Sequence, residues 1–212
     1  MKNFDCIIVG CGHAGAEAVL AGARMGLNMA VCCMDFSKAA SMPCNPSIGG
    51  SAKGQIVGEI DALGGIMGEA ADQTYMQIKY LNSSRGPAVQ ALRTQNDKYD
   101  YPKYVQNKIK SYSNITIIES EVLDIIVENG HSNGVILATG ESCFSKCVVV
   151  TTGTYLKGVT HIGLKNQPEG RMGDAPSSQL SESLQYHGFQ LGRLKTGTTP
   201  RVCLSSIDIN KM

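Results

Sequence analysis

The sequence predicts an α/β fold built around a Rossmann-type, dinucleotide-binding domain. An apolar run at residues 4–9 ends directly in a glycine-rich loop at residues 10–15. Small and apolar residues at helical spacing follow and stop at Gly26, and a second apolar run occupies residues 28–34. A strand, a glycine turn, a helix and a strand within about 30 residues have the length of one βαβ unit.

The composition is that of a globular α/β protein. The chain has 212 residues, 42% hydrophobic and 17% charged, and its net charge of +1 favours no class of charged partner. Its eight cysteines form no CxxC pair and no zinc-ligand spacing, so we expect no metal site. No apolar run approaches the ~20 residues of a membrane span, and the first strand is expected from Phe4. We therefore expect no leader peptide, no membrane contact and a cytoplasmic protein.

The glycine loop suits a phosphate-binding turn. It consists of Gly10, Cys11, Gly12, His13, Ala14 and Gly15. Gly10 would allow the tight turn, Gly12 the approach of a pyrophosphate, and Gly15 close packing of helix on strand. The free N–H groups of the helix N-terminus would favour an anion. The alternative is an ordinary strand-to-helix turn, and His13 could either donate to phosphate or cap the helix.

Two further features bear on the cofactor. Asp35 follows the loop at about the 20-residue spacing of a ribose-binding acid, although it could equally start a turn. An apolar strand at residues 147–151 ends in Thr152 and Gly153. Such a strand returns toward the cofactor in two-dinucleotide-binding flavoproteins, and this similarity favours FAD over NAD alone.

The whole chain is expected to form the N-terminal part of one FAD-binding domain, 1–212. The βαβ unit (4–35) precedes a CNPSIGG loop with a helical segment (36–112), a strand-rich segment (113–158) and a loop-rich segment (159–212). We expect helices at residues 55–63, 74–81, 88–109 (interrupted near Pro102) and 178–186, and strands at residues 115–119, 122–127, 134–138 and 147–151.

Several motifs, in this order, resemble one family. They are GCGHAGAEA (10–18), CNPSIGG (44–50), GQIVGEIDALGG (54–65), GPAVQALR (86–93), GTYLKG (153–158) and GRLKTGTTPR (192–201). This chain resembles the MnmG (GidA) family, the FAD subunit of the enzyme that places a carboxymethylaminomethyl group on carbon 5 of the tRNA wobble uridine, U34. The similarity runs through nearly the whole sequence.

The resemblance implies specific ligands, partners and residues. Such proteins bind FAD, use NADH, methylene-tetrahydrofolate and glycine or ammonium, modify tRNA with the GTPase MnmE, and are homodimers. The family's FAD contacts carry over to Gly10 through Gly15, to Val122 and to Ser177. Its CNPxIGG cysteine carries over to Cys44.

Members of the family are much longer than this chain. An inserted NADH-binding domain, a second essential cysteine and a helical C-terminal domain find no match in the 212 residues. The sequence is therefore expected to be an incomplete, N-terminal part of the enzyme that lacks turnover on its own.

Cys44 is the thiol that we expect to take part in chemistry. It lies in a polar, glycine-rich loop before a predicted helix, whose N–H groups could lower the thiol pKa. Attack on carbon 6 of a pyrimidine would activate carbon 5, and the thiol could alternatively move a proton. The competing interpretation is an inert loop cysteine beside the flavin.

Basic and tyrosine side chains alternate between residues 79 and 110, which suits phosphate contact and base stacking. Arg85 and Arg93 flank the GPA segment and are the first candidates for contact with tRNA or substrate. The alternative is a solvated helix face with extended lysine stems.

Three other functions stay open on the sequence. A folate-dependent tRNA uracil methyltransferase would share the glycine loop but is not expected to carry the CNPxIGG motif. A flavin oxidoreductase acting on a small molecule would differ in that tRNA would not change its rate of NADH oxidation. The third hypothesis is not an enzyme but an FAD-binding fragment without turnover.

Overall fold

The computed structural model describes residues 2–171, 173–197 and 202–211. Its α-helices are α1 (His13–Arg24), α2 (Lys53–Ala62), α3 (Ile66–Thr74), α4 (Asp100–Lys110) and α5 (Gln179–Tyr186). Its strands are β1 (Lys2–Val9), β2 (Met29–Cys33), β3 (Ser47–Gly49), β4 (Tyr75–Leu81), β5 (Ala91–Asn96), β6 (Ile115–Glu119), β7 (Val122–Glu128), β8 (His131–Leu137), β9 (Ser142–Val150), β10 (Val159–Ile162) and β11 (Lys165–Pro168). Short 3₁₀ turns are η1 (Phe36–Lys38), η2 (Pro87–Val89), η3 (Leu204–Ser206) and η4 (Ile209–Lys211).

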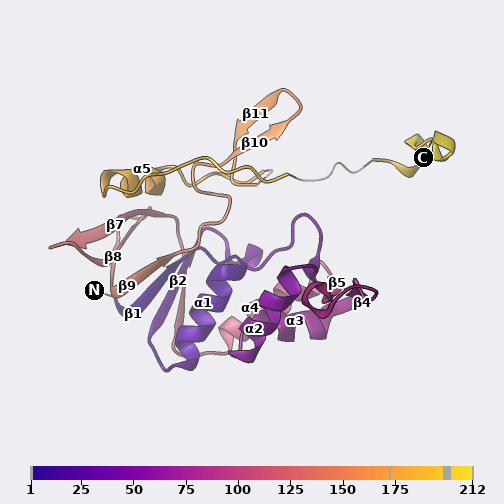
Figure 1. The fold of residues 1–212 in the computed structure, drawn as a ribbon. Coiled ribbons are helices and arrows are strands. Elements are labelled where there is room, and N and C mark those ends of the chain that lie inside the picture. Colours follow the sequence, from indigo (N-terminus) through magenta and orange to yellow (C-terminus); the bar gives the residue numbers. More distant parts are fainter. Residues whose placement is uncertain (1, 172, 198–201, 212) are drawn as a thin grey trace.

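A six-stranded sheet in the order β6-β2-β1-β9-β8-β7 forms the centre of the fold (Figure 1). The strands β6, β2, β1 and β9 run parallel, and the hairpins β9-β8 and β8-β7 are antiparallel. β1 lies between β2, the next strand in sequence, and β9, which comes more than a hundred residues later. The predicted α/β class and the initial βαβ unit are confirmed.

Both faces of β1 and β2 are buried, which explains their continuous apolar runs. On one face, Ile8 and Val31 pack in a core with Val19 of α1 and Val105 of α4. On the other, apolar side chains of β1, β7 and β8 surround Leu180 of α5. α1 and α4 therefore cover one face of the sheet and α5 covers part of the other.

A second, three-stranded sheet in the order β3-β5-β4 lies beside the helices, and two contacts attach it to the main core. The carboxylate of Glu17 in α1 accepts the N–H groups of Ile66 and Met67 at 3.0 and 2.8 Å, so it caps the N-terminus of α3. The buried Asn96 of β5 donates to the carbonyl of Ala71 in α3 at 2.9 Å. The second sheet is thereby fixed to α3, and α3 to α1.

The helix predicted at residues 74–81 is wrong, because this segment is strand β4. Met76, Ile78 and Tyr80 alternate with polar residues at a period of two, and the segment pairs with β5. The helix predicted at 88–109 is wrong in its first half, where η2 and β5 lie. Its second half is α4, with Pro102 in the first turn, where a missing N–H costs nothing.

The loop predicted for residues 36–54 contains the short strand β3. Ile48 pairs with Thr94 of β5, and Gly49 pairs with Arg93. The CNPSIGG motif therefore enters a sheet before α2 begins at Lys53. The predicted helix at 55–63, the predicted helix at 178–186 and the four strands predicted between 115 and 151 are confirmed, with ends shifted by a few residues.

In the described ranges, no helix has both the length and the apolar character needed to cross a bilayer. The longest among them, α1, has 12 residues.

Substitution by alanine should affect stability differently at two glycines of the loop, Gly12 and Gly15. A Cβ on Gly15 would lie 2.0 Å from the carbonyl oxygen of Gly10, whereas a Cβ on Gly12 would meet nothing within 4 Å. We expect Gly15→Ala to lower the free energy of unfolding by about 1–3 kcal/mol, the range of overpacked sites. Gly12→Ala should leave it within about 0.5 kcal/mol. Urea denaturation measures both, and equal losses in the two variants would contradict the packing role of Gly15.

Candidate functional site

A cavity of about 390 Å³ opens at the carboxyl ends of β1, β2 and β9. This is the point where the sheet order reverses around β1, and ligands of open α/β sheets bind at such a switch point. Its lining comes from the glycine loop, the end of β2 with η1, the β6–β7 connection and the segment after β9. The lining residues are Val9, Gly10, Cys11, Gly12, Cys32, Cys33, Met34, Asp35, Lys38, Ala39, Ser120, Glu121, Val122, Thr151, Thr152, Gly153, Thr154, Tyr155, Arg171, Gly173, Asp174, Ala175 and Ser177.

The three glycines of the loop meet three different surroundings. Gly10 has a φ of +99°, and a Cβ there would lie 2.6 Å from the carbonyl oxygen of Thr151. Gly15 touches the carbonyl of Gly10, as described above. Gly12 lines the cavity with open space where its Cβ would be. Two glycines are therefore required by the protein's own packing, and Gly12 leaves room for a ligand.

The N-terminus of α1 is directed at this cavity. Gly12 is its N-cap residue, no side chain caps the helix, and its first turn carries no acid. The first N–H groups of a helix lack partners within the helix and carry partial positive charge. The geometry suits a phosphate or another anion.

His13 lies beside this end of the helix but does not line the cavity. Its ring lies 5.7 Å, centroid to centroid, from that of Tyr101 in α4, and the two ring planes are tilted by 59°. Burial lowers the pKa of His13, and the charge of Arg171 lowers it further. The imidazole is therefore neutral at neutral pH, and it contributes packing against α4 instead of a positive charge.

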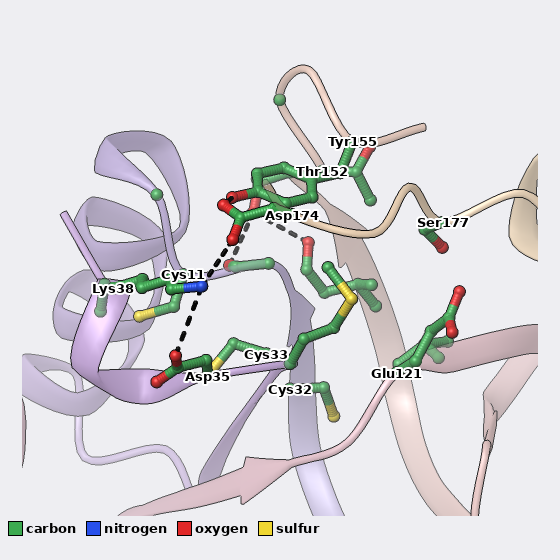
Figure 2. A pocket seen from close by; sticks show the side chains of 18 of the residues that line it. Cys11, Cys32, Cys33, Asp35, Lys38, Glu121, Thr152, Tyr155, Asp174 and Ser177 are labelled. Atoms are coloured by element: carbon green, nitrogen blue, oxygen red, sulfur yellow. Dashed lines mark hydrogen bonds and ion pairs between the residues drawn. The ribbon is translucent and has the colours of Figure 1, made fainter. Parts of the chain in front are cut away.

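Polar side chains form a clasp across the cavity, defined here as Lys38, Tyr155 and Asp174 (Figure 2). The Lys38 ammonium lies 2.5 Å from one carboxylate oxygen of Asp174 and 3.7 Å from Asp35. The Tyr155 hydroxyl donates to the other Asp174 oxygen at 2.7 Å. The clasp joins η1, which follows β2, to the segment that follows β9, and so it connects two walls of the cavity.

These contacts shift the titration of the clasp residues. The hydrogen bonds from Lys38 and Tyr155 lower the pKa of Asp174. Burial and the hydrogen bond to Asp174 raise the pKa of Tyr155 to about 12. At neutral pH the clasp therefore contains a carboxylate, an ammonium and a neutral phenol.

Asp35 begins a turn and also lines the cavity. Its carboxylate accepts the backbone N–H of Ser37 at 2.9 Å, and so it begins the turn η1. It also lines the cavity, with the hydrogen bond from the Ser37 hydroxyl as the main cause of its lowered pKa.

Three cysteines of the cavity wall are unsuited to act as nucleophiles. Burial raises the pKa of the Cys11, Cys32 and Cys33 thiols to about 12. They remain protonated at neutral pH, where a thiol is a poor nucleophile. Any thiolate chemistry must come from a cysteine outside this wall.

The predicted cofactor residues separate into two groups. Those that line the cavity are Gly10, Cys11, Gly12, Val122 and Ser177, and those that do not are His13, Ala14 and Gly15. Sequence reasoning missed the clasp as a unit. The position of Lys38, shortly after the end of β2, could have indicated that it lies near the cavity. Its ion-pair partner Asp174 could not be predicted, because it is 136 residues away in the sequence.

Cys44 lies on the exposed loop before β3 and is not part of the cavity lining. Two backbone hydrogen bonds hold this loop. The N–H of Asn96 donates to the carbonyl of Pro46 at 2.6 Å, and the N–H of Ser47 donates to that of Asn45 at 2.8 Å. The loop is thus fixed to β5, with its thiol accessible.

The two predicted arginines also lie outside the cavity. Arg85 lies in the β4–β5 connection, where its N–H donates to the carbonyl of Asn82 at 2.9 Å. Arg93 lies on β5, and its guanidinium donates to the Ser47 hydroxyl at 3.2 Å. The structure therefore groups Arg93 with the CNPSIGG motif. Residues 198–201 of the last motif lie outside the described residues.

Comparison with known proteins agrees with this architecture. The model of the family described as glucose inhibited division protein A matches residues 5–212. The chain is 47% identical over 210 residues to the tRNA uridine 5-carboxymethylaminomethyl modification enzyme MnmG of Bdellovibrio bacteriovorus, covering 99% of this chain and 33% of that protein. It is 48% identical over 209 residues to the MnmG of Geobacillus thermodenitrificans, with the same two coverages.

Solved structures agree as well. GidA from Aquifex aeolicus superposes with a TM-score of 0.90 at 48% identity, over 93% of this chain and 33% of that one. A GidA-related protein from Thermus thermophilus shares the fold, with a TM-score of 0.65 at 16% identity, over 88% of this chain and 69% of that one. The chain spans about a third of the length of the curated relatives it matches. From these matches and the residues that carry them, the chain belongs to the glucose inhibited division protein A (GidA/MnmG) family.

Proposed function

We propose that the chain is the FAD-binding part of an enzyme that installs the 5-carboxymethylaminomethyl group on the wobble uridine of tRNA. The observation that carries the proposal is the cavity at the switch point, with an uncapped helix N-terminus and Gly12 open toward it. The chain's similarity to proteins named for this modification supports the choice of reaction.

The residues present fit a dinucleotide. The space beside Gly12 would admit a pyrophosphate, and the N–H groups of α1 would bind it. Asp35 stands at the end of β2, where the acid that bonds a ribose is expected. Val122 and Ser177 line other walls of the same cavity and would contact the rest of the molecule.

Bound FAD would supply two-electron redox chemistry, and the chain's residues would hold and orient it. Glycines 10 and 15 keep the loop against the end of β9, while the clasp attaches Tyr155 and Asp174 to η1. The protonated thiols of the wall keep additional negative charge away from the phosphates. These residues would bind the cofactor without taking part in bond making.

Cys44 would supply the covalent chemistry on uridine. Its thiolate would add to carbon 6, and the electron pair of the 5,6 double bond would move toward carbon 5 and the carbonyl at carbon 4. Carbon 5 would then attack a one-carbon electrophile. Loss of the carbon 5 proton and departure of the thiolate restore the ring. A role for the thiol in proton transfer is the alternative for the same residue.

For the complete enzyme we infer NADH and methylene-tetrahydrofolate as cosubstrates, MnmE as the GTPase partner, a homodimer and a cytoplasmic location. These inferences rest on membership of the family. An oxidoreductase for a small molecule is the competing function, and stimulation of NADH oxidation by tRNA would exclude it.

Gly12→Ala should weaken FAD binding while the fold stays stable. The added Cβ would stand where the pyrophosphate approaches, and loss of one charge-assisted hydrogen bond costs about 1.5–3 kcal/mol, roughly ten- to a hundredfold in affinity. Quenching of flavin fluorescence measures the affinity. Gly58→Ala on α2, where a Cβ also meets nothing within 4 Å, is the matched control. Unchanged FAD affinity in Gly12→Ala would contradict the proposal that the pyrophosphate lies beside Gly12.

Cys44→Ser, made in the complete enzyme, should abolish modification and keep FAD bound. A serine hydroxyl is a much weaker nucleophile and acid, so we expect a loss of about a hundredfold or more in modification rate. Mass analysis of nucleosides from the treated tRNA measures the rate. Cys203→Ser changes another exposed cysteine and should have no effect. Full modification by Cys44→Ser would rule out both roles of the thiol.

A further inference from the structure

The three-stranded sheet presents a basic face that the cavity does not use. Directly opposed residues of antiparallel strands point to the same side, and Lys79 of β4 is opposite Arg93 of β5. Ser47 of β3 lies on the same side, because Gln95, two residues from Arg93, is opposite it and the Arg93 guanidinium reaches its hydroxyl. Lys79, Arg93 and Ser47 are called the basic face below.

The pairing of Lys79 with Arg93 is electrostatically unfavourable. Like charges directly opposite each other destabilise a sheet, and their Cβ atoms are about 4.5–5.5 Å apart. Among the described residues, no carboxylate lies within ion-pair distance of either side chain, and both side chains are exposed. Lys79 and Arg93 thus differ from Lys38, which pairs with Asp174, and from Lys146, which pairs with Asp5. An anion bound beside both charges would relieve their repulsion.

The arginine is held in position for such an anion. One terminal nitrogen donates to the Ser47 hydroxyl at 3.2 Å, and the other N–H groups of the guanidinium make no hydrogen bond to a described residue. Gln77 and Gln95, which oppose each other next to this pair, add uncharged amide groups on the same face. A guanidinium, an ammonium and neutral donors suit a phosphate, which accepts several hydrogen bonds.

The form of the surface favours a polymer over a small anion. Lys79 and Arg93 are exposed, and the basic face contributes no residue to the cavity at the switch point. Exposed lysine and arginine side chains bind the phosphates of nucleic acids through charge and counterion release, without enclosing them. Ser47 is three residues from Cys44, so the chain between them spans at most about 11 Å.

We propose that the basic face binds a backbone phosphate of the tRNA strand next to the uridine presented to Cys44. The assignment rests on the proposed function, and it goes beyond it by naming Lys79 as a contact and Ser47 as the residue that positions Arg93. The repulsion between Lys79 and Arg93 is relieved when the phosphate is bound. The cofactor cavity, on the six-stranded sheet, and the RNA contact, on the three-stranded sheet, are thus separate sites.

A charge reversal at Lys79 tests the proposal. In the complete protein, Lys79→Glu should pair with Arg93, so the thermal midpoint should rise while affinity for tRNA falls. Loss of one phosphate contact reduces the magnitude of the slope of log K against log salt by about 0.7–0.9. The fall in affinity between 0.1 and 1 M salt would then be smaller by about five- to eightfold than in the unmodified protein. Filter binding of tRNA at several salt concentrations gives the slope. Lys165→Glu on β11 makes the same charge change on the exposed hairpin away from this sheet and is the matched control.

The outcomes are distinct. A higher midpoint, weaker tRNA binding and a smaller slope in Lys79→Glu, with no change in Lys165→Glu, support the proposal. Equal losses in the two variants would show only a general charge effect and overturn it, as would unchanged tRNA binding in Lys79→Glu. Loss of binding to inorganic pyrophosphate with tRNA binding intact would assign the face to a small phosphate ligand and also overturn it. Failure of the unmodified protein to bind tRNA at all would instead refute the proposed function.

Discussion

The contact between the start of α1 and the ends of β1 and β9 is the constraint on which the rest of the structure depends. A Cβ on Gly15 would lie 2.0 Å from the carbonyl oxygen of Gly10, and a Cβ on Gly10 would lie 2.6 Å from that of Thr151, so neither position admits a side chain. The Thr151 hydroxyl donates to the carbonyls of Val9 and Gly10 at 3.0 Å each. Because the helix starts in this position, its N–H groups are directed into the space between β1, β2 and β9.

The cavity is therefore a product of sheet order as much as of the glycine loop. Insertion of β1 between β2 and β9 opens the crevice, and the clasp then connects its walls through contacts between residues 38, 155 and 174. Burial keeps the thiols in the wall protonated. The result is a mostly apolar site with a helix N-terminus at one end, which suits a cofactor that must be held and oriented.

The CNPSIGG motif belongs to the three-stranded sheet and not to the sheet that forms the cavity. Its strand β3 pairs with β5, and Asn96 of β5 is tied to α3, which Glu17 of α1 caps. A continuous path of hydrogen bonds thus runs from the cofactor helix to the loop that carries Cys44. This path ties the loop that carries Cys44 to α3 and α1.

The sequence by itself determined the βαβ unit, the roles available to the glycines and the family, since these depend on local spacing and on motifs within a few residues. The helix prediction for residues 74–81 missed β4, although the period-two alternation of Met76, Ile78 and Tyr80 is present in the sequence, and β5 is defined by its pairing with β3 and β4. The sequence did not determine the clasp or the opposition of Lys79 to Arg93. Those contacts join residues that are distant in sequence or depend on the register of a sheet, and register is decided by tertiary packing, which no local pattern contains.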